Sequence, residues 1–196
     1  MTNNDHQISY LGELLRKGIH ISSSSFAILL YFFGKKNILP PLIVITMIYI
    51  LFDYFRKNKK LNNLFLYYFK VITRSNEQKG AFTGATYVFL GITITVLFFD
   101  PVVAIPSILV MSLSDSASAI VGRKFNRIKI NNKSLEGSIA FYFTTLIIFY
   151  VFNFNLLYSM LVAILLTIIE YLDEVLIDDN LSLPIFSAIL INIFLI

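Results

Sequence analysis

Residues 115–137 read DSASAIVGRKFNRIKINNKSLEG and carry the polar groups around which the rest of the chain is organised. The stretch begins with the carboxylate of Asp115 inside an apolar run and ends with Ser134, Glu136 and Gly137, where the next apolar run starts. The segment between them is basic and contains Arg123, Lys124, Arg127, Lys129 and Lys133. An acid inside an apolar segment, a basic loop and a second acid indicate a membrane site for a metal-bound polyphosphate.

The composition is that of an integral membrane protein. Of the 196 residues, 57% are hydrophobic and 14% are charged, whereas the apolar fraction of soluble domains is about 45–50%. Several apolar runs approach the roughly 20 residues that a helix needs to cross a bilayer. We therefore predict an all-α fold, in which residues 1–196 form a single polytopic helical bundle. Cysteine is absent, which excludes disulfides and thiolate chemistry.

Seven transmembrane helices are predicted from the apolar runs, at 18–34, 38–55, 81–98, 102–121, 138–152, 156–172 and 181–196. Between the second and third of these, apolar side chains repeat at helical spacing, namely Leu61, Leu64, Phe65, Tyr68, Val71 and Ile72. This pattern predicts an amphipathic helix. It is too short to cross the bilayer, so we expect it to lie in the membrane interface.

The positions of the Lys and Arg residues predict how the chain is oriented. With the N-terminus in the cytoplasm, seven spans place all 16 of these residues except Lys35 and Lys36 on the cytoplasmic side. Cytoplasmic loops are enriched in such residues. The C-terminus then lies on the opposite side. The polar groups at the cytoplasmic ends of the spans meet in one site if the helices bundle.

Asp115 is the strongest single candidate for a functional residue in the sequence. A charge inside the bilayer costs at least about 2.5–3.5 kcal/mol on insertion scales, so this carboxylate should meet a cation or a metal ion. One interpretation is a salt bridge between helices, with Arg16 or Arg123 as the partner. The small residues Ser118 and Gly122 on the same stretch favour the other interpretation, which is space for a ligand.

Basic loops are common in membrane proteins, but the end of this loop also contains residues that can bind a ligand or transfer a proton. Lys133 can neutralise a phosphate, Ser134 can cap the following helix, and Glu136 can bind a divalent cation or accept a proton. Because Mg²⁺ prefers carboxylate oxygens and keeps substrate phosphates as ligands, Asp115, Glu136 and Asp179 form a candidate metal set. The sequence contains no Walker-type or kinase glycine loop.

Two further polar groups lie at ends of apolar runs. Four residues of the first run share one helical stripe, namely Glu13, Arg16, Lys17 and His20. They form either a surface ion pair with an interfacial histidine or part of a site in which His20 acts as acid, base or hydrogen-bond donor. Glu170 lies in the last turns of the sixth span. Asp179 and Asn180 follow it, where a helix cap is the simpler interpretation.

Four blocks taken together resemble the CTP-dependent lipid-alcohol kinase family, which includes dolichol kinase, phytol and farnesol kinases and the CTP-using diacylglycerol kinase. The blocks are ELLRKGIH at 13–20, DSASAIVGR at 115–123, KSLEGS at 133–138, and Glu170 with DNLSLP at 179–184. The resemblance implies a membrane kinase that transfers the γ-phosphoryl group of CTP to a lipid hydroxyl with a divalent metal. Asn126 departs from it, because the family often has glycine there.

The resemblance also implies roles for individual residues. Asp115, Glu136 and Asp179 would be metal-binding or catalytic carboxylates, with Glu136 as first choice and His20 as second for activating the hydroxyl. The nucleotide and its phosphates would be bound by Arg16, Lys17, Gly122, Arg123, Lys129, Lys133, Ser134, Gly137 and Asn180. Glu13 and Glu170 complete the candidate site. The expected ligands are CTP, Mg²⁺ and a membrane lipid alcohol, and no nucleic acid is expected.

Two other functions remain open from the sequence. A cytidylyltransferase that forms a CDP-lipid is also polytopic and acid-rich, but its glycine-rich signature with an Asp-Arg cluster is not found here. A non-enzymatic transporter or lipid-binding protein would use Asp115 and Glu170 as ion or proton sites inside the membrane. In a transporter the basic loop need not contribute, whereas a kinase needs Lys133.

Overall fold

The structure is a computed structural model that describes residues 10–125, 127–130, 133–176 and 178–196. The side chains of 129, 130 and 173–176 are not described, and Asn126 lies outside the described residues. The phosphate contacts predicted for the Lys129 side chain therefore also lie outside them.

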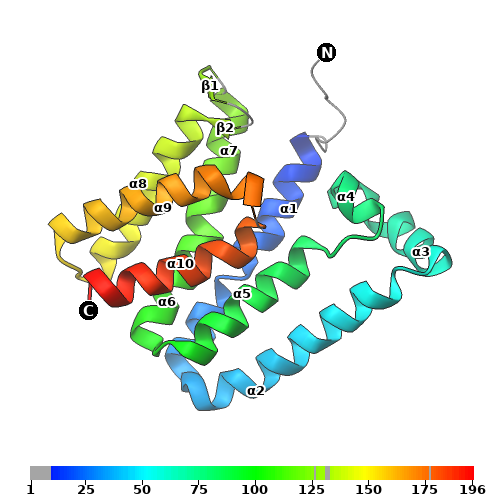
Figure 1. Cartoon of the computed structure of the whole chain (residues 1–196), viewed down its shortest axis with the longest axis horizontal. Helices are drawn as coiled ribbons and strands as arrows, with labels where there is room; N and C mark the ends of the chain where they lie inside the picture. The colour runs from blue at the N-terminus through cyan, green and yellow to red at the C-terminus, as the bar shows by residue number, and fades with distance from the viewer. Residues whose placement is uncertain (1–9, 126, 131–132, 177) are drawn as a thin grey trace.

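The described chain is almost entirely helical, which confirms the all-α prediction (Figure 1). The helices are α1 (Tyr10–Ser22), α2 (Ser25–Phe55), α3 (Lys59–Phe69), α4 (Ser75–Gln78), α5 (Gly84–Phe98), α6 (Pro101–Leu109), α7 (Asp115–Phe125), α8 (Leu135–Val151), α9 (Leu156–Leu176) and α10 (Asp179–Phe194). A 3₁₀ turn, η1 (Lys70–Ile72), follows α3, and a π-helical turn, η2 (Val110–Ser114), joins α6 to α7. Two short strands, β1 (Lys129–Ile130) and β2 (Lys133–Ser134), pair antiparallel before α8.

The first reversal of the chain occurs inside α2, at Gly34. Its φ of 71° and ψ of 164° belong to a region that is essentially open to glycine alone. The helix therefore breaks here between the first and second apolar runs, as the sequence predicts. Lys35 follows the break, and its ammonium group donates to the carbonyls of Leu97 (2.9 Å) and Phe99 (3.1 Å). This contact fixes the reversal against the C-terminal end of α5.

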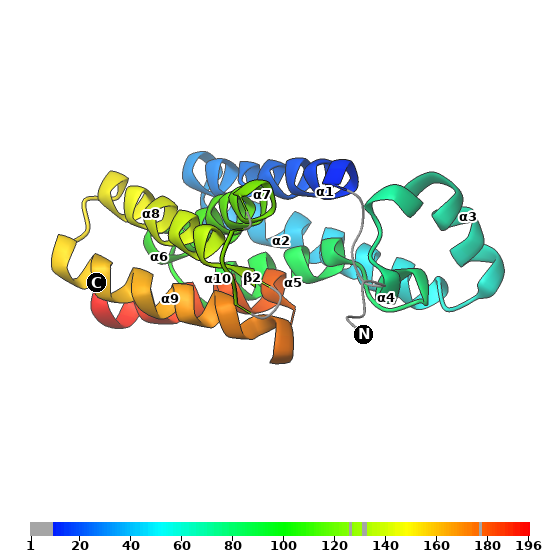
Figure 2. The same ribbon diagram turned by 90° about the horizontal axis from the view of Figure 1, so that it is seen from above.

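Close helix contacts hold the centre of the bundle together. A Cβ at Gly91 of α5 would lie 2.5 Å from the carbonyl oxygen of Asn180 and 2.7 Å from Pro184 Cγ, so α5 and α10 approach without a side chain between them. The buried core is formed mainly by α5, α6, η2 and α8–α10, with Ile92, Ala104, Ile108, Met111, Phe141, Leu166 and Leu183. The view in Figure 2 places α1 and α9 on opposite sides of the molecule.

Large apolar side chains also cover the outside of the bundle. Phe32, Phe98 and Leu157 are each more than 70% exposed, which is the arrangement that a protein surrounded by lipid requires. Two stretches, Tyr10–Phe55 and Pro101–Phe125, are long and apolar enough to cross a membrane. Shorter apolar helices cover Gly84–Phe98, Leu135–Val151, Leu156–Leu172 and Asp179–Phe194. The number of spans and their orientation stay predictions.

Candidate functional site

The centre of the site is an ion pair between α1 and α7. The ammonium group of Lys17 donates to Asp115 Oδ2, and both side chains are at least 95% buried. His20 Nε2 lies 3.2 Å from the same oxygen and 2.9 Å from the carbonyl oxygen of Met111 in the π-helical turn. Because a carbonyl only accepts, Nε2 must carry a hydrogen in this arrangement. His20 is therefore placed as a donor.

This pairing corrects one alternative from the sequence, in which Arg16 or Arg123 neutralises Asp115. Both arginines instead contact Glu13: Arg16 at 2.6 Å and Arg123 at 3.3 Å. Their side chains are 15% and 29% exposed, so both reach the surface of the site. The Arg16 Nε atom is buried and has no hydrogen-bond partner within the described part of the chain. Part of its donor capacity is thus free for an anion.

A second ion pair joins the basic loop to α9. Lys133 Nζ lies 2.8 Å from Glu170 Oε1 and also donates to the backbone carbonyl of Glu170. The hydroxyl of Ser118 donates to the same carboxylate oxygen at 3.1 Å. Burial opposes the charge of Lys133, but the carboxylates around it, Glu170 first and then Asp179 and Asp115, together raise the pKa of Lys133 above its ordinary value. The other oxygen, Oε2, is buried and accepts no hydrogen bond from any described group.

The start of α8 is arranged by its own polar residues. Ser134 Oγ accepts from the Gly137 backbone N–H at 3.1 Å, which caps the helix as the sequence predicts. Glu136 Oε1 accepts from the backbone N–H groups of Arg127 (3.2 Å) and Ile128 (3.3 Å). Its second oxygen is buried with no hydrogen-bond partner among the residues described. Glu136 therefore holds the basic loop with one oxygen and leaves the other free.

The two glycines of the candidate set lie where α7 crosses α8. A Cβ at Gly122 would lie 2.7 Å from Ser134 Oγ, and one at Gly137 would lie 2.9 Å from the carbonyl oxygen of Ser118. The space beside Gly122, which the sequence favours as room for a ligand, is therefore filled by the start of α8. These glycines permit the close approach that brings Asp115 and Lys133 into one site.

The start of α10 completes the site. Asp178 Oδ1 accepts from the backbone N–H (3.1 Å) and the side-chain amide (2.7 Å) of Asn180, so Asp178 caps the helix. Asp178 Oδ2 lies 3.8 Å from Arg74. Burial and the adjacent charge of Asp179 raise the pKa of Asp178 to about 6, against the effect of Arg74. Asp179 lies within range of the charges of Lys17, Arg74, Asp115 and Lys133.

The predicted set of three metal ligands is not brought together. Among the residues whose side chains the structure describes, no group of three Asp, Glu or His side chains is arranged to hold a metal ion. Asp115 is engaged by Lys17 and His20, and Glu136 is turned toward the backbone of the basic loop. Mg²⁺ often takes only one or two carboxylates when phosphates supply the remaining oxygens. The free oxygens of Glu136 and Glu170 fit this smaller requirement.

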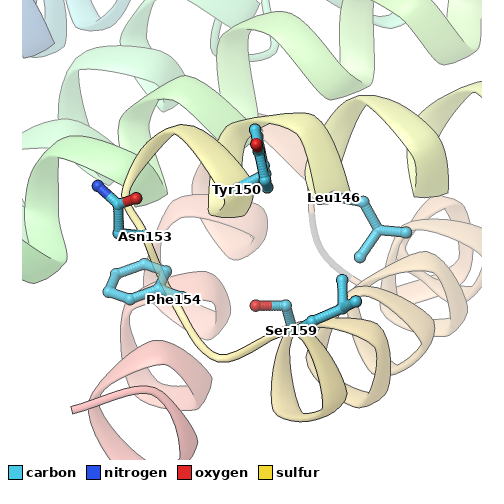
Figure 3. Close-up of a pocket in the computed structure, with 6 residues that line it drawn as sticks. Leu146, Tyr150, Asn153, Phe154 and Ser159 are labelled. Carbon is cyan, nitrogen blue, oxygen red and sulfur yellow. The ribbon is translucent and has the colours of Figure 1, made fainter.

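A cavity of about 230 Å³ lies elsewhere, at the turn between α8 and α9. Figure 3 shows Ser159 facing the space between the two helices, with Phe154 and Tyr150 around it. Ser159 and Glu170 are on the same helix, α9, eleven residues or about 16 Å of helix apart. This cavity is therefore separate from the ion pairs.

Proteins of similar sequence come from several organisms. An uncharacterized protein of Rickettsia prowazekii is 31% identical over 192 residues, covering 93% of this chain and 94% of the relative. An uncharacterized protein of Methanocaldococcus jannaschii is 30% identical over 190 residues, covering 92% and 93%. The chain belongs to the same family as these two proteins.

A third relative has a named activity. CTP-dependent diacylglycerol kinase 1 of Saccharomyces cerevisiae is 28% identical over 213 residues, which cover 92% of this chain and 72% of the yeast protein. The match supports the resemblance to CTP-dependent lipid kinases at the level of the family. No family profile matches the chain, and no solved structure matches it.

The sequence did not predict a buried hydrogen-bond network that holds Arg74 beside the site. Asp53 is fully buried; it accepts from Arg56 at 2.7 Å and from the backbone N–H of Thr83 at 2.8 Å. Glu77 accepts from the backbone N–H groups of Arg74 (2.9 Å) and Gly84 (2.7 Å). The sequence carries one signal for this network, because Glu77 is the single acidic residue in the basic segment 56–80.

Proposed function

We propose that this protein is a CTP-dependent lipid kinase that transfers the γ-phosphoryl group of CTP to the hydroxyl of a membrane lipid alcohol. The observation that carries the proposal is a cluster of three ion-paired carboxylates in an apolar helical bundle. Lys17 pairs with Asp115, Lys133 pairs with Glu170, and Arg16 and Arg123 share Glu13. The yeast relative named as a CTP-dependent diacylglycerol kinase supports the choice of nucleotide and of lipid acceptor.

Phosphoryl transfer depends mainly on positioning and on neutralising charge. Arg16 and Arg123 share the Glu13 carboxylate and remain partly exposed, so they are placed to bind the outer phosphates. Lys17 and Lys133 are held by Asp115 and Glu170 in fixed positions deeper in the site. Their ammonium groups would stabilise the charge that develops on the transferred group.

The acceptor hydroxyl needs a group that takes its proton. Glu136 is the better candidate, because one of its oxygens has no partner in the described chain while the other fixes its position on the loop. His20 is the weaker candidate, because its Nε2 already carries a hydrogen toward Met111. When bound, Mg²⁺ would neutralise the nucleotide phosphates. The buried Oε2 of Glu170, which has no partner in the described chain, is the proposed protein ligand, and the phosphates would supply the remaining oxygens.

The location of the reaction follows from the same proposal. The basic loops and the site residues are placed at the cytoplasmic face, with the N-terminus inside and the C-terminus outside, in agreement with the positive-inside rule. Cytosolic CTP and a lipid in the bilayer would then meet at the ends of α1, α7 and α8.

The test uses purified protein with Mg²⁺, CTP labelled at either the α- or the γ-phosphate, and ATP as the competing donor. Diacylglycerol, phytol, farnesol, dolichol and undecaprenol serve as acceptors. We expect label from the γ-position in one of these lipids and none from the α-position. Labelled lipid from α-labelled CTP would instead indicate a cytidylyltransferase. No labelled lipid from any acceptor would refute both transferase functions.

A further inference from the structure

Helix α3 lies apart from the rest of the bundle, beyond the end of α2 (Figures 1 and 2). Arg56, at the end of α2, fastens it there: its guanidinium lies 4.0 Å from the centre of the Phe65 ring and donates to Asn62 of α3. The same guanidinium pairs with Asp53 at 2.7 Å. These contacts give α3 a fixed position without covering its apolar face.

That apolar face forms one wall of a groove of about 280 Å³ between α3 and α2. Phe52 and Phe55 of α2 line one side, and Leu64, Phe65 and Tyr68 of α3 line the other. Three of these side chains are more than half exposed, namely Phe55, Leu64 and Tyr68. An apolar groove of this kind suits a hydrocarbon chain.

A cationic cluster lies where α3 begins, next in sequence to Arg56 and Leu61, which line the groove; the ammonium group of Lys57 lies 5.3 Å from the centre of the Tyr54 ring. Lys57, Lys59 and Lys60 are exposed, and no described carboxylate forms an ion pair with any of them. No acidic residue occurs between Asp53 and Glu77. Both of those carboxylates are already used inside the protein. The positive charge of this surface therefore has no acidic partner in the neighbouring sequence.

The position of the lysines within α3 adds to this imbalance. Lys59 and Lys60 occupy the first turn, which contains no acidic residue, and cations at the positive end of a helix dipole are unfavourable. Lys60 precedes Leu64 by four residues and so shares the groove face. An anionic group beside these lysines would relieve the repulsion and stand at the mouth of the groove.

We propose that the groove and the three lysines bind an anionic glycerophospholipid, with one acyl chain in the groove and the headgroup phosphate against Lys57, Lys59 and Lys60. This site is separate from the candidate kinase site and needs no nucleotide. Each lysine near an anionic lipid contributes about fivefold in affinity, so the three together give a preference over neutral lipid of up to about 100-fold.

The absence of tryptophan from the chain allows a direct test. Tyr68→Trp introduces a single fluorophore in the groove, and Tyr31→Trp introduces one at a position of α2 that is 72% exposed and does not line the groove. Each variant is placed in nanodiscs of neutral lipid that contain a small fraction of brominated phosphatidylglycerol or of brominated phosphatidylcholine. We expect quenching at position 68 to be several-fold stronger with the anionic lipid, and quenching at position 31 to show little preference.

Charge variants in the Tyr68→Trp background identify the headgroup site. Replacing Lys57, Lys59 and Lys60 by Gln should abolish the preference, and replacing the same three by Arg should keep it. Circular dichroism checks that both variants fold, and salt near 1 M, which screens charges beyond about 3 Å, tests the unmodified lysines independently. Equal quenching by the two lipids, the same preference at position 31, or a preference that survives both the Gln variant and high salt would overturn the proposal.

Discussion

The pair formed by Lys133 and Glu170 allows the structural and catalytic roles of the basic loop to be separated. Their side chains are 14% and 3% exposed and lie 2.8 Å apart. Removing one partner of a buried ion pair costs about 3–5 kcal/mol. We expect Lys133→Met to cost about 3 kcal/mol, at the lower end of this range, because the lysine side chain is 14% exposed. For a chain of this length, this corresponds to about 6–12 °C in Tm.

The double variant Lys133→Met with Glu170→Gln supplies the decisive comparison. Replacing both partners removes the uncompensated charge, so its stability should return to within about 1 kcal/mol of the wild type. Transfer of label from γ-labelled CTP should remain lost, because the proposed phosphate-binding cation is still missing. Lys124→Met, a matched loss of charge from an exposed residue at the other end of the loop, should change neither quantity appreciably.

Both measurements use the purified protein in one detergent: thermal unfolding for stability, and label transfer to the accepted lipid for activity. A double variant that regains activity would refute the phosphate-binding role of Lys133 and leave it as a structural partner of Glu170. A Lys133→Met variant with unchanged Tm would refute the buried ion pair itself.

Three further predictions follow from other contacts. Gly122→Ala should lower stability by about 1–3 kcal/mol, because its Cβ would lie 2.7 Å from the hydroxyl that caps α8, whereas Gly18→Ala, with nothing within 4 Å, should not; thermal unfolding measures both. Asp53→Asn should cost about 3–5 kcal/mol, because it leaves the buried guanidinium of α2 without its carboxylate; unchanged unfolding would contradict this. The pKa of Asp178 is raised to about 6 from an ordinary 3.8, so the folded state holds this proton more tightly than the unfolded state. The stability of the wild type relative to Asp178→Asn should therefore fall as pH rises from about 4 to about 6, and stay level above pH 6. Unfolding measured across this range tests the sign, and a rise would contradict it.

The positions of the helices were predicted well because the signal for them is local. The predicted segments 81–98, 138–152 and 156–172 correspond to α5, α8 and α9 with shifts of a few residues at their ends. The amphipathic pattern beginning at Leu61 corresponds to α3 and the turn after it. Apolar run length and side-chain periodicity are properties of neighbouring residues, so they can be read without knowing which helices touch.

The partners of the charged residues could not be predicted in the same way. The sequence indicated that Asp115 needs a cation, and the structure supplies Lys17 instead of Arg16. These two residues are adjacent, but successive residues of a helix point about 100° apart, so the rotation of α1 against α7 decides which one meets the carboxylate.

By itself, the sequence determined an all-helical, strongly apolar chain with its polar groups at the ends of apolar runs, because composition and periodicity suffice for that. Only the tertiary structure decided that Gly122 and Gly137 bring α7 against α8, that Glu13 joins two arginines, and that the three expected metal ligands do not share one point. These outcomes depend on how helices distant in sequence rotate and pack. The free energy of burying each charge then selects its partner from the groups that packing brings within reach.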